Sequence, residues 1–177
     1  MKTLNRSHLW LVRPWLAVFA AMLFAVAAPA KDQVPATAEV SQTPLGPPVI
    51  HPDGSQEFFT AGRGVSSQMG RITVETHLCV AGPTEFGYDL ESNSLLVYWR
   101  GTAITRAANG DTQRVKFSGC NIVPLDGFGQ PVPPPHQYAG LYEITGGTGR
   151  FQGASGHGTI TGVELGNATG NYRTIGV

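Results

Sequence analysis

The chain has 177 residues, with 12 basic and 12 acidic residues and 23 glycines. Residues 1–30 hold three of the basic residues and none of the acidic ones, which leaves a formal charge of −3 for the rest. This balance argues against nucleic-acid binding, which usually needs a clustered basic surface. All the glycines and 11 of the 13 prolines follow residue 30. This composition predicts one all-β domain of short strands joined by many turns.

Residues 1–30 have the pattern of a signal peptide. Lys2, Arg6 and Arg13 form a basic start, residues 15–27 are apolar, and Ala28-Pro29-Ala30 fits a small-x-small cleavage site. The apolar run is shorter than the roughly 20 residues that a membrane-spanning helix needs. We therefore expect export to the periplasm or beyond, with no membrane span after cleavage. A retained N-terminal anchor is the alternative.

The next segment, residues 31–55, is rich in proline and alanine and shows no clear period of two or 3.6. Such a composition favours an extended, mobile chain. We therefore predict a flexible arm over residues 31–55 and a β-domain over residues 56–177.

Alternating side chains predict the first strands of that domain. In residues 71–78, the apolar Ile72, Val74 and Leu78 share one face, whereas Glu75 and His77 share the other. Residues 95–106 form a longer predicted strand with apolar residues on both faces. Trp99 lies on the face of Leu95, Val97 and Ala103, and Tyr98 and Arg100 lie on the opposite face.

The later strands follow at similar intervals. Asn109-Gly110 predicts a hairpin, because both residues tolerate positive φ. The returning strand, residues 112–118, directs Val115 and Phe117 inward. Residues 126–136 are predicted to form a loop, because consecutive prolines lack the N–H donors that a central strand needs. Further strands are predicted over residues 138–145, 156–164 and 172–175, and the last of these would close a barrel.

A glycine-rich run links the two strands at 138–145 and 156–164. Its members are Gly146, Gly147, Thr148, Gly149, Arg150, Phe151, Gly153, Ala154 and Gly156. A phosphate-binding loop would need a lysine and a following helix, and neither is present. We interpret the run as a tight turn in which Phe151 fixes the loop to the end of a barrel and Ala154 packs where a larger side chain would clash. The run resembles the glycine motif of the allene oxide cyclase and dirigent barrel superfamily, and the 107–111 turn is similar to one in secreted bacterial members.

This resemblance implies a single antiparallel eight-stranded β-barrel with an axial cavity, which is often trimeric in that superfamily. It also implies a small apolar ligand and a homo-oligomer, either a trimer or a dimer. Plant allene oxide cyclases convert a fatty-acid epoxide to a cyclopentenone, and dirigent proteins steer radical coupling. Their catalytic carboxylates lie outside the glycine motif, so the resemblance transfers no catalytic residue to this chain.

The candidate site residues come from the strand faces. Glu75, His77, Arg100, Tyr142 and Glu143 are candidates for proton chemistry if they line a desolvated interior. On a solvated outer face they would have no such role, and the apolar residues beside Glu75 and His77 form the better inner set. Tyr98, Trp99 and Phe117 are candidates to line an apolar ligand cavity, or to form ordinary core.

Cys79 and Cys120 are the two cysteines, and in an exported protein such a pair predicts a disulfide. Two free thiols are the alternative. The histidines show no HxH or HExxH spacing, so the sequence predicts neither a metal site nor a cofactor. The resulting hypothesis is an exported, non-catalytic binding or scaffold barrel for a small apolar molecule. The alternative is a cofactor-free cyclase or isomerase acting on an apolar substrate.

Overall fold

A computed structural model describes residues 35–166 and 168–176, and these residues fold into a closed β-barrel. Eight long strands form the wall of this described part: β1 (Ala36–Pro44), β3 (Gln56–Ser66), β4 (Gly70–Val80), β6 (Ser94–Ala107), β7 (Thr112–Pro124), β8 (His136–Gly147), β9 (Gly156–Gly166) and β10 (Thr169–Gly176). Two short strands, β2 (Val49–Ile50) and β5 (Gly87–Asp89), pair with β3 and β6. Single 3-10 turns form η1 (Pro83–Glu85) and η2 (Gly149–Phe151).

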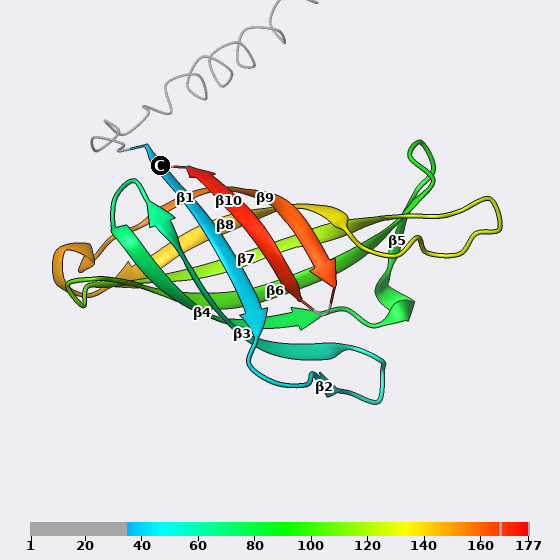
Figure 1. The fold of residues 1–177 in the computed structure, drawn as a ribbon, viewed down its shortest axis with the longest axis horizontal. Coiled ribbons are helices and arrows are strands. Elements are labelled where there is room, and N and C mark those ends of the chain that lie inside the picture. The colour runs from blue at the N-terminus through cyan, green and yellow to red at the C-terminus, as the bar shows by residue number, and fades with distance from the viewer. Residues whose placement is uncertain (1–34, 167, 177) are drawn as a thin grey trace, which may run out of the picture. The chain divides into compact units, whose positions relative to one another are not determined.

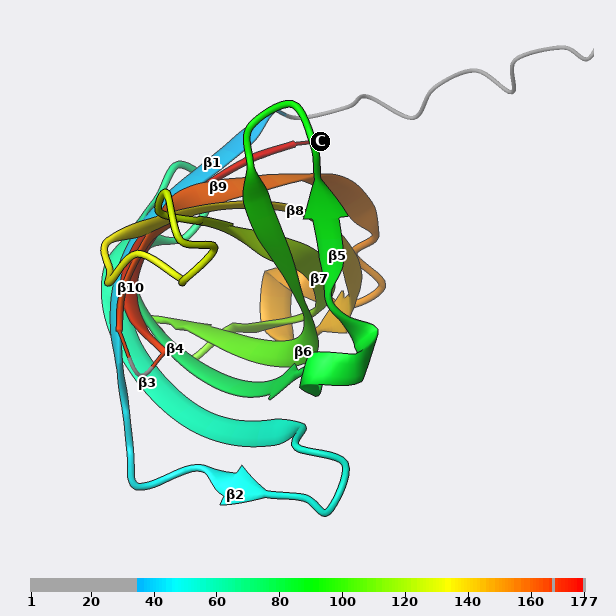
Figure 2. The ribbon, with the colours of Figure 1, turned by 90° about the vertical axis from the view of Figure 1, so that its right-hand side faces the viewer.

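Every neighbouring pair of wall strands is antiparallel. The order around the barrel is β1-β10-β9-β8-β7-β6-β4-β3, and β3 pairs with β1 to close the ring (Figures 1 and 2). Closure gives each wall strand two hydrogen-bonded neighbours and so removes the free edges that an open sheet would expose. The prediction of an all-β, eight-stranded antiparallel barrel is confirmed.

The predicted arm is wrong for residues 36–44, because these residues are the strand that closes the barrel. β1 pairs with β10 on one side and with β3 on the other. Its inward face carries Ala38, Val40 and Gln42, and Val40 is only 4% exposed. Because Val40 is the one large apolar side chain among small and polar residues on this face, β1 shows almost no alternation of hydrophobic residues. The sequence therefore did not indicate a strand here.

The predicted signal peptide at residues 1–30 lies outside the described residues, as do residues 31–34 of the predicted arm. Along the described ranges, no helix combines the length and apolar character needed to cross a membrane.

Inside the barrel, large aromatic rings lie over glycines of neighbouring strands. Phe117 lies against Gly101, Trp99 against Gly119 and Gly140, and Tyr142 against Gly158. Tyr138 covers Gly162 in the same way. Large and small residues on neighbouring strands thus complement each other, as small barrels require. The predicted inward orientation of Ile72, Val74, Val115 and Phe117 is confirmed by their alternation in burial, and Leu78 lies on the same face of β4 as Ile72 and Val74. Trp99, for which neither face of its strand was chosen, is buried on the inner face.

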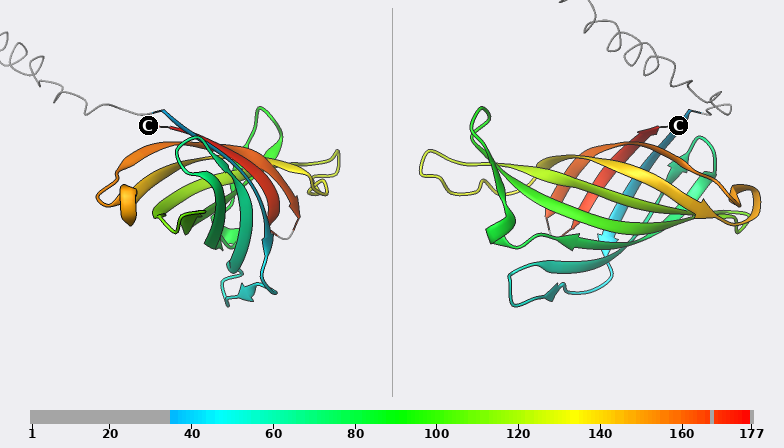
Figure 3. Two further views of the ribbon diagram at one scale, coloured as in Figure 1. Left: turned by 60° about the vertical axis from the view of Figure 1, so that its left-hand side comes forward. Right: turned by 180° about the vertical axis from the view of Figure 1, so that it is seen from behind.

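The two ends of the barrel differ. At one end, called here the motif end, lie the β3–β4 and β6–β7 hairpins and the glycine-rich run (Figure 3). Met69, Ile72 and Val74 are at most 5% exposed there, and Phe151 packs against them from the glycine-rich run. At the other end, called here the β5 end, lie β2, β5 and the 125–135 loop, which face the viewer in Figure 2.

The glycine-rich run has the structural role that we predicted. It connects the paired strands β8 and β9 through η2, with positive φ at Gly146, Gly149 and Gly153. Phe151 and Ala154 pack against the two apolar clusters of the interior. The run is also joined to the β6–β7 hairpin. The Thr148 and Thr112 hydroxyls are 2.8 Å apart, and Arg150 Nε lies 3.4 Å from Asp111 Oδ2.

Candidate functional site

Four of the five predicted catalytic side chains lie outside the barrel. Glu75, Arg100 and Glu143 are exposed, and His77 shares their outward face in a partly exposed position. Only Tyr142 faces the interior, where it is buried. The five residues therefore form no common site, and the interpretation of Glu75 and His77 as outer-face residues is correct.

The three predicted ligand-binding aromatics also divide between the two faces. Tyr98 is 43% exposed on the outer surface. Trp99 and Phe117 face inward and meet edge to face, with their ring centroids 5.8 Å apart. Trp99 makes a second edge-to-face contact with Tyr138, also at 5.8 Å. The interior therefore has an aromatic wall toward the β5 end.

A histidine–glutamate pair faces the interior at that end. His136, the first residue of β8, lies directly opposite Glu164 of β9. The distance between His136 Nδ1 and Glu164 Oε2 is 3.3 Å, and the side chains are only 10% and 16% exposed. The other ring nitrogen, Nε2, lies 2.8 Å from the Val132 carbonyl oxygen. Both nitrogens thus face oxygen acceptors, which fixes the ring orientation.

Other inward-facing polar groups at this end have partners within the protein. Trp99 Nε1 donates to Asn121 Oδ1 over 3.0 Å, and the Thr60 hydroxyl donates to Gln42 Oε1 over 3.1 Å. The Tyr138 hydroxyl donates to the Asn171 carbonyl oxygen. Burial raises the pKa of Tyr138 well above its usual range, and the negative charges of Tyr172 and Glu164 add to this effect.

Several inward-facing apolar residues remain partly exposed at the β5 end. They are Leu78, Val80, Leu95 and Val97, whereas Ile72 and Val74 toward the motif end are buried. Phe58 and Val123, the cross-strand neighbours of Leu78 and Leu95, are buried, so the exposure is confined to part of the inner face at this end. The combination of aliphatic side chains, an aromatic wall and a few fixed polar groups is typical of a site for a small apolar molecule. The His136–Glu164 pair is also able to hold or move a proton.

Sequence reasoning missed this pair for two reasons. His136 was assigned to the end of a proline-rich loop, although it begins β8. Glu164 lies on the same face of β9 as Ile160, so the alternation of residues in this strand could have predicted that Glu164 points inward. Nothing in either segment indicated that the two residues would be paired across β8 and β9.

A second cluster of titratable side chains lies on the outer face of β3 and β4. The carboxylate of Glu57 contacts two imidazoles, with His77 Nε2 3.1 Å from Oε2 and His51 Nε2 3.1 Å from Oε1. Cys79 Sγ lies 3.9 Å from His77 Nε2. Hydrogen bonds from His77 first, and then from His51, hold the pKa of Glu57 below its ordinary value. These residue types are also the common ligands of zinc and copper.

The expected disulfide is not formed, and Cys79 and Cys120 are free thiols. Cys79 lies on β4 and Cys120 on β7, with β6 between them. Their partners on β6 are Arg100 and Tyr98, which are two residues apart. Two interstrand steps and two residues along the strand separate the Cα atoms by about 12 Å. A disulfide usually requires less than about 7 Å.

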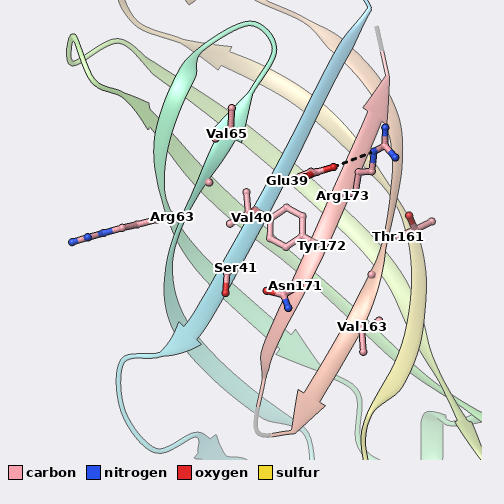
Figure 4. A pocket seen from close by; sticks show the side chains of 12 residues that line it. Glu39, Val40, Ser41, Arg63, Val65, Thr161, Val163, Asn171, Tyr172 and Arg173 are labelled. Carbon is pink, nitrogen blue, oxygen red and sulfur yellow. Dashed lines mark ion pairs between the residues drawn. The ribbon is translucent and has the colours of Figure 1, made fainter.

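An open groove of about 590 Å³ runs along the outside of β1, between β3 and β10 (Figure 4). Arg63 and Val65 lie on its β3 side, and Glu39 pairs with Arg173 across β1 and β10 at 3.8 Å. These side chains are exposed and spread over a flat strand surface. The charged side chains of the groove are all exposed, so it is a weaker candidate for chemistry than either cluster.

No family model matches this chain, and comparisons with curated proteins and with solved structures found no match either. The function must therefore be argued from the barrel and its side chains.

Proposed function

We propose that this protein is an exported binding barrel that holds a small apolar molecule at the β5 end of its interior. The observation that carries the proposal is a group of four inward apolar side chains near the β5 end, Leu78, Val80, Leu95 and Val97, that remain partly exposed, whereas Met69, Ile72 and Val74 at the motif end are buried. The aromatic wall of Trp99, Phe117 and Tyr138 would contact the molecule, and His136 and Glu164 would contact a polar group on it. The outward direction of Glu75, Arg100 and Glu143 agrees with a non-catalytic role.

Membership of the allene oxide cyclase and dirigent superfamily is part of this proposal. The glycine-rich run and the eight-stranded barrel support it, and the axial cavities of that superfamily would correspond to the β5-end interior. Export directed by residues 1–30 and a dimeric or trimeric assembly are also proposed. Native mass spectrometry of the protein from its own host would report the assembly and any co-purified small molecule together.

The binding site is tested by titrating a long-chain fatty acid while recording tryptophan fluorescence. Trp99 is the only tryptophan after residue 30, so the signal lost in a Trp99→Phe variant identifies its contribution. Val97→Phe would narrow the β5 end and is expected to weaken binding about tenfold or more. The matched control is Val65→Phe in the outer groove, which should leave binding unchanged. Weakening by Val65→Phe alone would place the ligand in the groove and contradict the proposal.

A cofactor-free cyclase or isomerase is the second candidate, and the His136–Glu164 pair is the observation that favours it. A partly desolvated imidazole and carboxylate in contact are suited to proton transfer within a bound apolar substrate. Once a co-purified molecule supplies a substrate class, Glu164→Gln should abolish turnover while leaving the fluorescence-measured affinity within about threefold. Turnover that persists in both Glu164→Gln and His136→Gln would contradict catalysis by this pair.

A further inference from the structure

The outer cluster of Glu57, His77 and Cys79 has the composition and geometry of a metal site. The ligand atoms of these three side chains all lie within 4.8 Å of one another. Tetrahedral zinc sites have bonds of about 2.0–2.3 Å, which place their ligand atoms about 3.3–3.6 Å apart. The observed separations of 3.1 Å and 3.9 Å bracket this range. Small side-chain rotations would therefore bring the three atoms onto one ion.

Barrel register holds these ligands in place. Glu57 of β3 lies directly opposite Cys79 of β4, and His77 is two residues from Cys79 on the same face. Phe59 lies opposite His77 and stacks on it, with centroids 4.7 Å apart and an interplanar angle of 5°. This stacking limits rotation of the imidazole. The fixed orientation of a ligand histidine is what metal sites usually obtain from their surrounding residues.

A fourth ligand is available from the β2–β3 turn. His51 follows β2, and its Nε2 already lies 3.1 Å from the carboxylate of Glu57. Its backbone is held within the turn, because His51 N donates to Ser55 O and Gly54 N donates to His51 O. His51 is outside the group of three whose ligand atoms lie within 4.8 Å of one another, so its side chain would turn toward the ion to complete a set of two imidazoles, one carboxylate and one thiol.

We propose that His51, Glu57, His77 and Cys79 bind one borderline-soft divalent cation, of which zinc is the best match. Two nitrogens, one oxygen and one sulfur suit tetrahedral zinc, whereas calcium and magnesium prefer oxygen ligands alone. Binding exchanges the Cys79 thiol proton for a metal–sulfur bond, and that proton is released to solvent. The thiolate and the carboxylate then balance the charge of the ion. The side chains of His51, Glu57 and His77 are 32–41% exposed, so the ion reaches them from solvent.

The free state of Cys79 is essential to this site. A disulfide to Cys120 would remove the sulfur ligand, but β6 separates the two cysteines. Cys120 also lies on the outer wall of the barrel, away from the cluster, and therefore provides a matched control for every test of Cys79. The site is independent of the β5-end interior, so it does not rest on the proposed function.

The test uses cobalt as a spectroscopic substitute for zinc. The full chain, without a histidine tag, is purified in reductant and chelator, and cobalt(II) is then added to the chelator-free protein. We expect a one-to-one complex with thiolate-to-cobalt charge-transfer absorption and the intense visible bands of tetrahedral cobalt. Zinc should then displace the cobalt. Failure of the wild-type protein to show the thiolate band would overturn the proposal.

Variants assign the ligands. Cys79→Ser should abolish the charge-transfer band, and Glu57→Gln should weaken zinc binding by more than about tenfold. Cys120→Ser and the outward-facing His157→Gln should keep both the band and the affinity. Circular dichroism checks that each variant is folded. Zinc should raise the thermal stability of the wild type and of the two control variants, but not of Cys79→Ser, which separates loss of a ligand from unfolding. A band that survives in Cys79→Ser but disappears in Cys120→Ser would refute this assignment.

Discussion

Tyr138 and Tyr172 show how the barrel interior acts on single residues. Both side chains point inward, and burial raises the pKa of each hydroxyl far above the ordinary value of a tyrosine. The physical cause is desolvation, which penalises the charged phenolate more than the neutral phenol. In the unfolded chain each hydroxyl would titrate at about pH 10. The folded barrel therefore retains protons that the unfolded chain releases above that pH.

This difference predicts a loss of stability in alkaline solution. Above about pH 10 the folded state binds more protons than the unfolded state, so the free energy of unfolding falls as pH rises. Below about pH 10 both states are protonated and these two residues give no pH dependence. Urea unfolding at intervals from pH 8 to pH 11.5 would measure the fall. Tyr138→Phe and Tyr172→Phe together should make it shallower, and an equally steep fall in this double variant would contradict the argument.

At the scale of elements, the glycine-rich run fixes the junction between β8 and β9. Gly149 and Gly153 both have positive φ, at 60° and 74°. They differ in their surroundings, because a Cβ on Gly149 would overlap the Asp111 carboxylate, whereas a Cβ on Gly153 would meet nothing within 4 Å. The Asp111 carboxylate is in turn paired with Arg150. Gly149 is therefore needed both for its positive φ and because the Asp111 carboxylate packs against it. Gly153 is needed for its positive φ alone.

Alanine substitutions should separate these two contributions. Gly153→Ala should cost about 1–2 kcal/mol, which is the ordinary penalty of a left-handed alanine. Gly149→Ala carries the same penalty and an overlap that should add about 1–3 kcal/mol. Urea unfolding of both variants would measure the difference. In an Asp111→Ala background the two costs should converge, and an unchanged gap there would show that the carboxylate is not its source.

Strands with large alternating side chains were predictable from the sequence, whereas β1 was not. In β4, Ile72 and Val74 alternate with polar residues, so the sequence shows both the strand and its inner face, whereas β6 has apolar residues on both faces and shows only the strand. β1 presents only Val40 as a large inward residue. β1 is held by backbone hydrogen bonds to β3 and β10. Such bonds do not depend on which side chains the segment carries, so its composition does not predict them.

At the scale of the whole molecule, both candidate sites depend on the register between neighbouring wall strands. Glu57 and His77 are brought together by the β3–β4 register, and His136 and Glu164 by the β8–β9 register. A shift of one residue in either pairing would turn one partner to the opposite face. Single-strand patterns predicted which face a side chain occupies, as for His77. They did not predict its cross-strand neighbour, because register is set by turns and by packing of the complete ring.

The contrast between the two ends predicts uneven hydrogen exchange along the barrel axis. Amides of residues 72–76 lie beside the buried core of the motif end and should exchange only when the whole domain unfolds. Amides of residues 94–97 lie where inward side chains are partly exposed, and local opening there should make exchange at least about tenfold faster. Exchange followed by mass spectrometry would compare the two segments within one sample. A molecule bound at the β5 end should slow exchange in both segments, because a ligand that binds only the folded barrel raises the free energy of global unfolding as well as that of local opening. Equal protection of both segments without ligand would instead show that the β5 end is as tightly closed as the motif end, and the binding site would then have to be sought on the outer face.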